Sequence, residues 1–90
     1  MTYKADIHIT LKHGVLDPQG KASLVALDHL GFQGVQDVRQ GKYIELWLDA
    51  SDEKEAQSQA EAMCEKLLAN TVIESYAVSI IEAKQQPSAA

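Results

Sequence analysis

Residues 3–12 read YKADIHITLK, and this stretch decides the fold. Apolar side chains stand at every second position from Tyr3 to Leu11, and mostly polar or charged side chains fill the positions between them. Because successive side chains of a strand point to opposite faces of its sheet, this alternation predicts a strand with one buried face. Such a face needs a covering layer, so the rest of the chain should supply further strands and helices.

The segment after this strand predicts a loop followed by a helix. Asp17 and Pro18 form a helix-start signal, since proline fits the first helical position and aspartate caps free backbone N–H groups. Residues 21–30 place three leucines on one side, and Gly31 is typical of a residue that ends a helix.

The middle of the chain predicts a β-hairpin. Residues 35–40 and 43–49 are interpreted as two strands. Gly41 and Lys42 lie between them and form a Gly-X pair, which suits a two-residue turn.

The last third predicts a helix and a final strand. Residues 51–55 open an amphipathic helix, where Asp52 and Glu55 resemble a capping box, and residues 72–83 form the strand. The resulting order, βαββαβ, predicts an α+β, ferredoxin-like fold with a four-stranded antiparallel sheet and both helices on one face. We expect one domain over residues 1–83 and a flexible C-terminal tail over residues 84–90.

Composition narrows the class of protein. The chain has 90 residues, enough for one domain with a single core, and a formal net charge of −5 at pH 7. An acidic chain is poorly suited to nucleic acid, because binding phosphates needs a basic patch. No apolar run approaches the ~20 residues that span a bilayer, and no signal-peptide pattern is present, so we expect no membrane partner and a cytoplasmic location.

Two helices cover only one face of such a sheet, so the other face should carry exposed aromatic side chains. His8, Tyr43 and Trp47 fall on this face in the predicted strands. Contiguous apolar surface marks interfaces, and aromatic residues are enriched there. These three residues are therefore our candidates for self-association, through this face or an adjacent edge. In the alternative interpretation, Trp47 lies under the C-terminal tail.

Residues that could carry chemistry are few. Cys64, the only cysteine, lies on the apolar stripe of the second helix, which favours a small buried hydrophobe over a nucleophile. His8, His13 and His29 lack the paired spacing of metal ligands. Arg39 and Lys42 form a small basic tip that could hold an acidic patch on a partner or the phosphate of a ligand, with simple solvation as the alternative.

Three separate motifs resemble one known family. Residues 15–20 (VLDPQG), 37–42 (DVRQGK) and 63–74 (MCEKLLANTVIE) are similar, in this order, to PurS, the small subunit of phosphoribosylformylglycinamidine synthase. The likeness runs over about residues 3–82. It implies a subunit of the complex that makes formylglycinamidine ribonucleotide from formylglycinamide ribonucleotide, glutamine and ATP in purine synthesis.

The resemblance also implies the partners. A PurL-type synthetase would hold ATP and magnesium, and a PurQ-type glutaminase would release ammonia. The present chain would bridge the two and support ammonia transfer as a homodimer or a dimer of dimers. It would hold no catalytic, cofactor-binding or metal-binding residue of its own.

The density of the motifs suggests which residues contact a partner. Asp17, Gln19, Arg39 and Lys42 are our docking candidates. Two other classes of function remain open from the sequence. Ferredoxin-like domains can act as sensor modules that bind an amino acid or nucleotide at a dimer interface, and the chain could be a free-standing enzyme on this scaffold.

Overall fold

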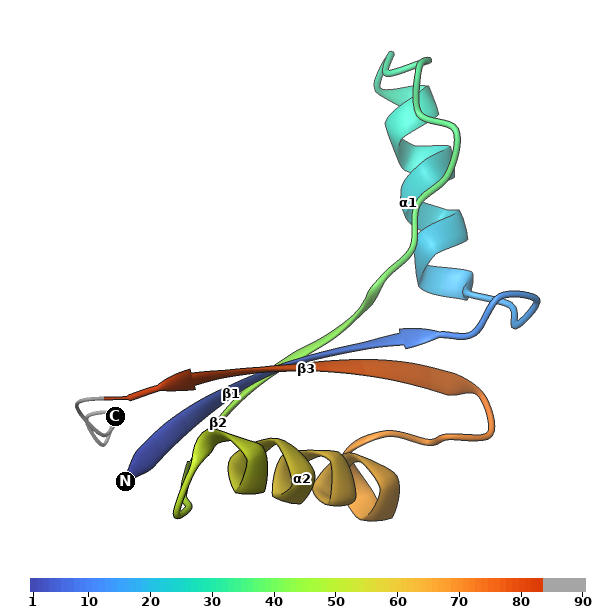
Figure 1. The fold of residues 1–90 in the computed structure, drawn as a ribbon. Helices are drawn as coiled ribbons and strands as arrows, with labels where there is room; N and C mark the ends of the chain where they lie inside the picture. Colours follow the sequence, from blue (N-terminus) through green and yellow to red (C-terminus); the bar gives the residue numbers. More distant parts are fainter. Residues whose placement is uncertain (84–90) are drawn as a thin grey trace.

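A computed structural model describes residues 1–83, and the tail predicted over residues 84–90 lies outside these residues. Three strands form one antiparallel sheet with β1 in the centre, between β2 and β3 (Figure 1). Along the chain the elements are β1 (Thr2–Leu11), α1 (Pro18–His29), β2 (Gly41–Asp49), α2 (Glu53–Met63), η1 (Cys64–Leu68) and β3 (Glu74–Glu82). The class is α+β, as the sequence predicts.

The central strand follows the predicted alternation. Ala5, Ile7 and Ile9 are at most 1% exposed, and the residues between them face the other side of the sheet. Ile7 lies opposite Ile44 of β2 and Val78 of β3. Since β1 has a partner on each side, its backbone N–H and C=O groups are satisfied within the sheet, and its apolar face forms the middle of the core.

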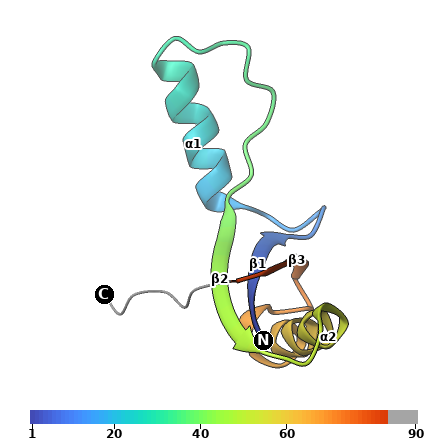
Figure 2. The same ribbon diagram turned by 60° about the vertical axis from the view of Figure 1, so that its left-hand side comes forward.

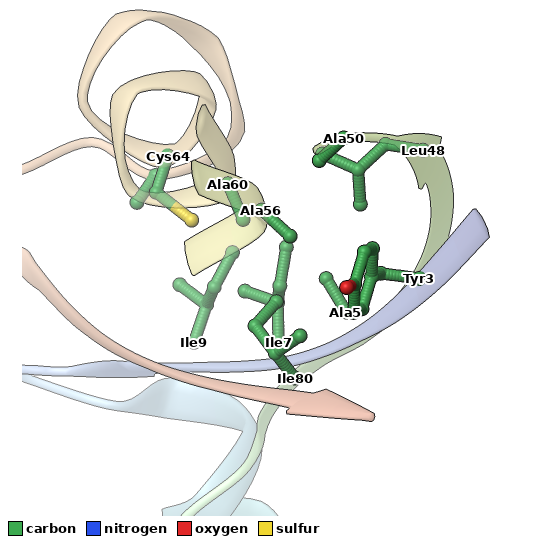
Figure 3. Packing of buried hydrophobic residues seen from close by; sticks show 11 residues of the cluster. Tyr3, Ala5, Ile7, Ile9, Leu48, Ala50, Ala56, Ala60, Cys64 and Ile80 are labelled. Carbon is green, nitrogen blue, oxygen red and sulfur yellow. The ribbon is translucent and has the colours of Figure 1, made fainter. Parts of the chain in front are cut away.

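Helix α2 covers this apolar face. Its side chains Ala56 and Ala60, together with Cys64, are completely buried against Ile7 and Ile9 (Figure 3). Small residues let a helix approach a sheet closely, and α2 packs on β1 and β3.

The ends of α2 follow the sequence signals in part. The carboxylate of Asp52 accepts a hydrogen bond from the Glu55 backbone N–H at 2.8 Å, so the predicted cap is present. The Glu55 carboxylate instead accepts from the Ser51 hydroxyl. The last turn, η1, is π-helical, and the Ala69 N–H donates to the Cys64 carbonyl at 3.0 Å.

The prediction of a four-stranded sheet is wrong. Residues 35–40 form no strand, and Gly41 and Lys42 are the first residues of β2, opposite Thr10 and Ile9. The predicted hairpin turn is therefore also wrong. Residues 35–40 run back alongside α1, away from the sheet, and pair with no strand of the described chain (Figures 1 and 2).

The prediction that both helices lie on one face of the sheet is wrong as well. Helix α1 projects away from the sheet and makes no extensive contact with any strand or with α2 (Figures 1 and 2). Its limits nevertheless match the local signals. Asp17 caps the start, and Gly31, with φ at +98°, follows the end. The Phe32 N–H donates to Leu27 and the Gly31 N–H to Asp28, which is the Schellman arrangement.

The core generates the first prediction. Replacing Ile7 by Ala should lower the free energy of unfolding by about 2–5 kcal/mol, because it removes a fully buried side chain and leaves a cavity. Val72→Ala is the control and should change it by less than about 0.5 kcal/mol, since Val72 is 81% exposed. Urea unfolding followed by circular dichroism measures both. Equal effects of the two substitutions would contradict the assigned core.

Candidate interaction surfaces

Residues 12–40 form a projecting segment that we call the arm. It consists of a loop, helix α1 and the stretch that returns to β2 (Figure 2). An isolated helix of ~12 residues is marginal in water, so α1 needs a surface to pack on. The arm also leaves large apolar side chains exposed: Leu16, Val25, Leu30, Phe32 and Val35. The arm thus presents apolar surface that no other element of residues 1–83 covers.

The base of the arm is held by one carboxylate. Asp17 Oδ1 accepts the Gly20 N–H at 2.9 Å, and Asp17 Oδ2 accepts the Gln40 N–H at 2.9 Å. The first bond caps α1, and the second ties the helix start to the residue before β2. Hydrogen bonds from Gln40 and then Gly20 hold the pKa of Asp17 below its usual range. Asp17 thus joins the two ends of the arm at its base.

Two glycines allow the close approach at this base. A methyl group on Gly20 would collide with the Asp17 carboxylate and the Val38 carbonyl. A methyl group on Gly41 would collide with the Ile9 carbonyl. Glycine is required at both positions because the backbones lie too close for a side chain. Two of the three sequence motifs therefore build the arm base.

The four predicted docking residues all lie at this base. Arg39 donates to the Leu11 carbonyl, and Lys42 lies 3.7 Å from the Glu74 carboxylate. Gln19 is exposed and lines a hollow of about 350 Å³ together with Asp17 and Lys42. Three of the four side chains thus make contacts within the chain. Their docking role stays a prediction.

A second surface lies beside η1, and we call it the β2 groove. It is a hollow of about 570 Å³ between β2 and the helical layer. Helix α2 packs over β1 and β3, so the inward side of β2 lacks a cover. Leu67, at 82% exposed, stands at the rim. Apolar side chains form most of the lining: Ile44, Leu46, Met63, Leu67 and Leu68. Sequence reasoning missed this groove, because it assigned the covering position to the chain's own first helix.

The face of the sheet opposite α2 is a polar network with aromatic members. Lys4 Nζ lies 3.2 Å from Asp6 Oδ1 and 2.5 Å from Glu45 Oε2. The Tyr43 hydroxyl donates to Asp6 Oδ1 at 2.9 Å. This bond, followed by the one from Lys4, lowers the pKa of Asp6. The side chains of this face are therefore ordered by one another.

The three self-association candidates lie within or beside this network. The His8 and Tyr43 rings are 4.8 Å apart between centroids, and Lys4 Nζ lies 5.7 Å from the Trp47 ring centroid. His8 and Tyr43 are exposed, and Trp47 is half-buried. The structure brings the three side chains to one face, and their role in self-association stays a prediction.

The residues considered for catalysis are dispersed. Cys64 is fully buried in the core, and burial raises the pKa of its thiol, which makes it an unreactive hydrophobe. Among residues 1–83, no three His, Cys, Asp or Glu side chains lie close enough to hold a metal ion. None of the helices in this part of the chain is long and apolar enough to cross a membrane.

A small α+β body with a projecting arm and an uncovered apolar groove defines a class of protein, the assembly module. Comparison of the sequence with known protein families identifies the particular family. The model of the family PurS, phosphoribosylformylglycinamidine (FGAM) synthase, matches residues 4–82. The chain belongs to the PurS family, and the resemblance carried by the three motifs is confirmed.

Individual relatives agree with this assignment. The phosphoribosylformylglycinamidine synthase subunit PurS of Synechocystis is 52% identical over 79 residues, which cover 88% of this chain and 79% of the relative. PurS of Thermus thermophilus superposes with a TM-score of 0.82 at 43% identity, over 92% of this chain and 99% of that one. A chain in the structure of PurLQS from Thermotoga maritima gives a TM-score of 0.83 at 30% identity, over 90% and 99%.

The arm base predicts a dependence on pH. Because the folded-state pKa of Asp17 is lowered, its contribution to the arm is complete above the usual aspartate pKa and is lost as pH falls through the folded-state value. The hydrogen-exchange protection of the Gly20 and Gln40 amides, measured by NMR, should fall over this acidic range. Asp17→Asn should lower the protection at neutral pH.

Asp37→Asn is the matched control for this experiment. The Asp37 carboxylate accepts a hydrogen bond from its neighbour, the Val38 N–H, and ties no distant segments together in the described chain. The Asp37→Asn substitution should therefore leave the hydrogen-exchange protection of the Gly20 and Gln40 amides unchanged. If Asp37→Asn lowers this protection as much as Asp17→Asn does, Asp17 does not hold the arm base.

Proposed function

We propose that this chain is a non-catalytic subunit of an FGAM synthase and assembles with a PurL-type synthetase and a PurQ-type glutaminase. Two observations carry the proposal in this member of the PurS family, the unpartnered arm and the open apolar groove. The PurLQS structure from Thermotoga maritima, which contains a chain similar to this one, supports it. Exposed apolar surface of this extent is typical of chains that function within an assembly.

The role that fits this chain is to bridge the two larger subunits and to support ammonia transfer. Ammonia that meets water is protonated and lost as a nucleophile, so its path has to be closed at subunit junctions. A rigid wedge closes such a junction without breaking any bond. ATP and magnesium then belong to the PurL-type partner. We place the complex in the cytoplasm, in keeping with a single cysteine that is free and buried.

We propose further that two copies associate through the arm and the β2 groove. The groove is the place where a βαββαβ chain would pack its first helix, and here the chain's own α1 points away from it. The arm of a second copy carries apolar side chains of the kind that could fill the groove, among them Val25 and Leu30. A two-fold arrangement lets each copy cover the other, which is the usual symmetry of soluble dimers.

A dimer of dimers needs another contact besides this one. The face that carries His8, Tyr43 and Trp47 is the candidate, because it lies on the side of the sheet away from the groove. Its aromatic rings suit an interface, and its charged groups are already paired with one another.

Omission of the chain tests the proposed function directly. The PurL-type and PurQ-type proteins of the same organism should show glutamine-driven FGAM formation only when this chain is added, because the junction stays open without it. Turnover with ammonium salt in place of glutamine is the control and should depend on the chain much less. Full glutamine-driven turnover in its absence would refute the proposal.

The groove predicts a change in oligomeric state. Leu67→Glu should shift the chain from dimer toward monomer at low micromolar concentration, because a charge at the rim cannot be buried against the apolar arm. Val72→Glu is the matched control, since Val72 is 81% exposed and lies outside the groove. Sedimentation velocity measures both variants. A dimer that survives Leu67→Glu, or dissociates equally with Val72→Glu, contradicts the groove interface.

A further inference from the structure

The arm base carries a cluster of positive charge. Lys12, Lys21 and Arg39 line one polar hollow of about 200 Å³, and none of them forms an ion pair with a carboxylate in residues 1–83. They come from three segments: the loop after β1, the first turn of α1 and the stretch that leads to β2. The chain as a whole has a formal net charge of −5, so this local surplus stands against an acidic background.

Two carboxylates, Asp17 and Asp37, line the same hollow, so its three cations leave a formal surplus of one positive charge, and both carboxylates are engaged locally. Asp17 accepts two backbone N–H groups, and Asp37 accepts the Val38 N–H at 2.9 Å. His13 also lines the hollow. Both carboxylates thus have hydrogen-bond donors from the backbone, whereas Lys12 and Lys21 are exposed and without an acidic partner in the described chain.

The cluster is held in place. Arg39 donates to the Leu11 carbonyl, next to Lys12, and Asp17 links the start of α1 to Gln40, next to Arg39. These contacts keep the three segments that carry the cations close together. Segments that are already held together lose less freedom on binding a partner than independent ones would.

We propose that this cluster docks a carboxylate-rich surface segment of another subunit of the synthase. The inference rests on the proposed function and assigns one of the contact surfaces in that assembly. Charge complementarity identifies the occupant, because a hollow lined by Lys12, Lys21 and Arg39 favours an acidic neighbour. A small free anion fits less well, since no buried polar side chain lines the hollow and exposed lysines are strongly hydrated.

The test compares two charge reversals. Lys21→Glu and Lys54→Glu each change one exposed lysine in the first turn of a helix, and neither lysine forms an ion pair among residues 1–83. An acidic residue in the first turn suits the helix dipole, so both variants should fold. Binding kinetics of each variant to the PurL-type and PurQ-type proteins, at low and high ionic strength, give the readout.

Lys21→Glu should slow association about tenfold at low ionic strength, and Lys54→Glu less than about twofold. The difference should disappear at high salt, because screening removes steering between exposed charges. Adding Lys12→Glu to Lys21→Glu should enlarge the effect. Circular dichroism of each variant confirms the fold.

Equal effects of the two reversals, in a wild-type chain that does bind its partners, would overturn the docking surface and leave the proposed function intact. A wild-type chain that binds neither partner would refute the proposed function itself. Inorganic phosphate, titrated by NMR, covers the small-anion alternative. The proposal would also be overturned if phosphate bound saturably, if Lys21→Glu abolished this binding, and if the same variant associated with the PurL-type and PurQ-type proteins at the wild-type rate.

Discussion

The burial of β1 under α2 is the interaction on which the rest of the molecule depends. Ala5, Ile7 and Ile9 exclude water only because α2 brings small side chains close to them. A helix is too narrow to cover three strands at once, and α2 lies over β1 and β3. The inward side of β2 is therefore left as a groove, and the chain's first helix, α1, is not there to fill it. The opening for a partner follows directly from how the core is made.

The second constraint is the carboxylate of Asp17. It satisfies a free N–H group at the start of α1 and, with its other oxygen, the N–H of Gln40. A single side chain thus serves as a helix cap and as a link between two ends of the arm. The neighbouring glycines make room for this contact. Motif residues that suggest recognition from the sequence alone turn out to have a structural task, and the segments that carry the neighbouring cations are held together through it.

The open sheet face, the arm base and the β2 groove differ in how their charges are paired. On the open sheet face, Lys4 is paired with Asp6 and Glu45, so charge there is largely neutralised within the chain. At the arm base, Lys12 and Lys21 have no such partner among residues 1–83. The groove is apolar. Three surfaces with different chemistry suit a subunit that contacts several neighbours, because each contact can be selective for its own partner.

The sequence by itself determined the local structure and the family. The alternation in residues 3–12, the cap at Asp17 and the stop at Gly31 each depend on neighbours within a few residues, and all three are present. The number of strands and the place of α1 depend on long-range packing, which periodicity does not encode. Residues 35–40 have the composition of a strand but lie beside α1, and Gly41 begins the strand that follows. Only the tertiary structure decided that residues 35–40 leave the sheet and return beside α1, because the hydrogen bond that closes this arm joins Asp17 and Gln40, which are far apart in the sequence.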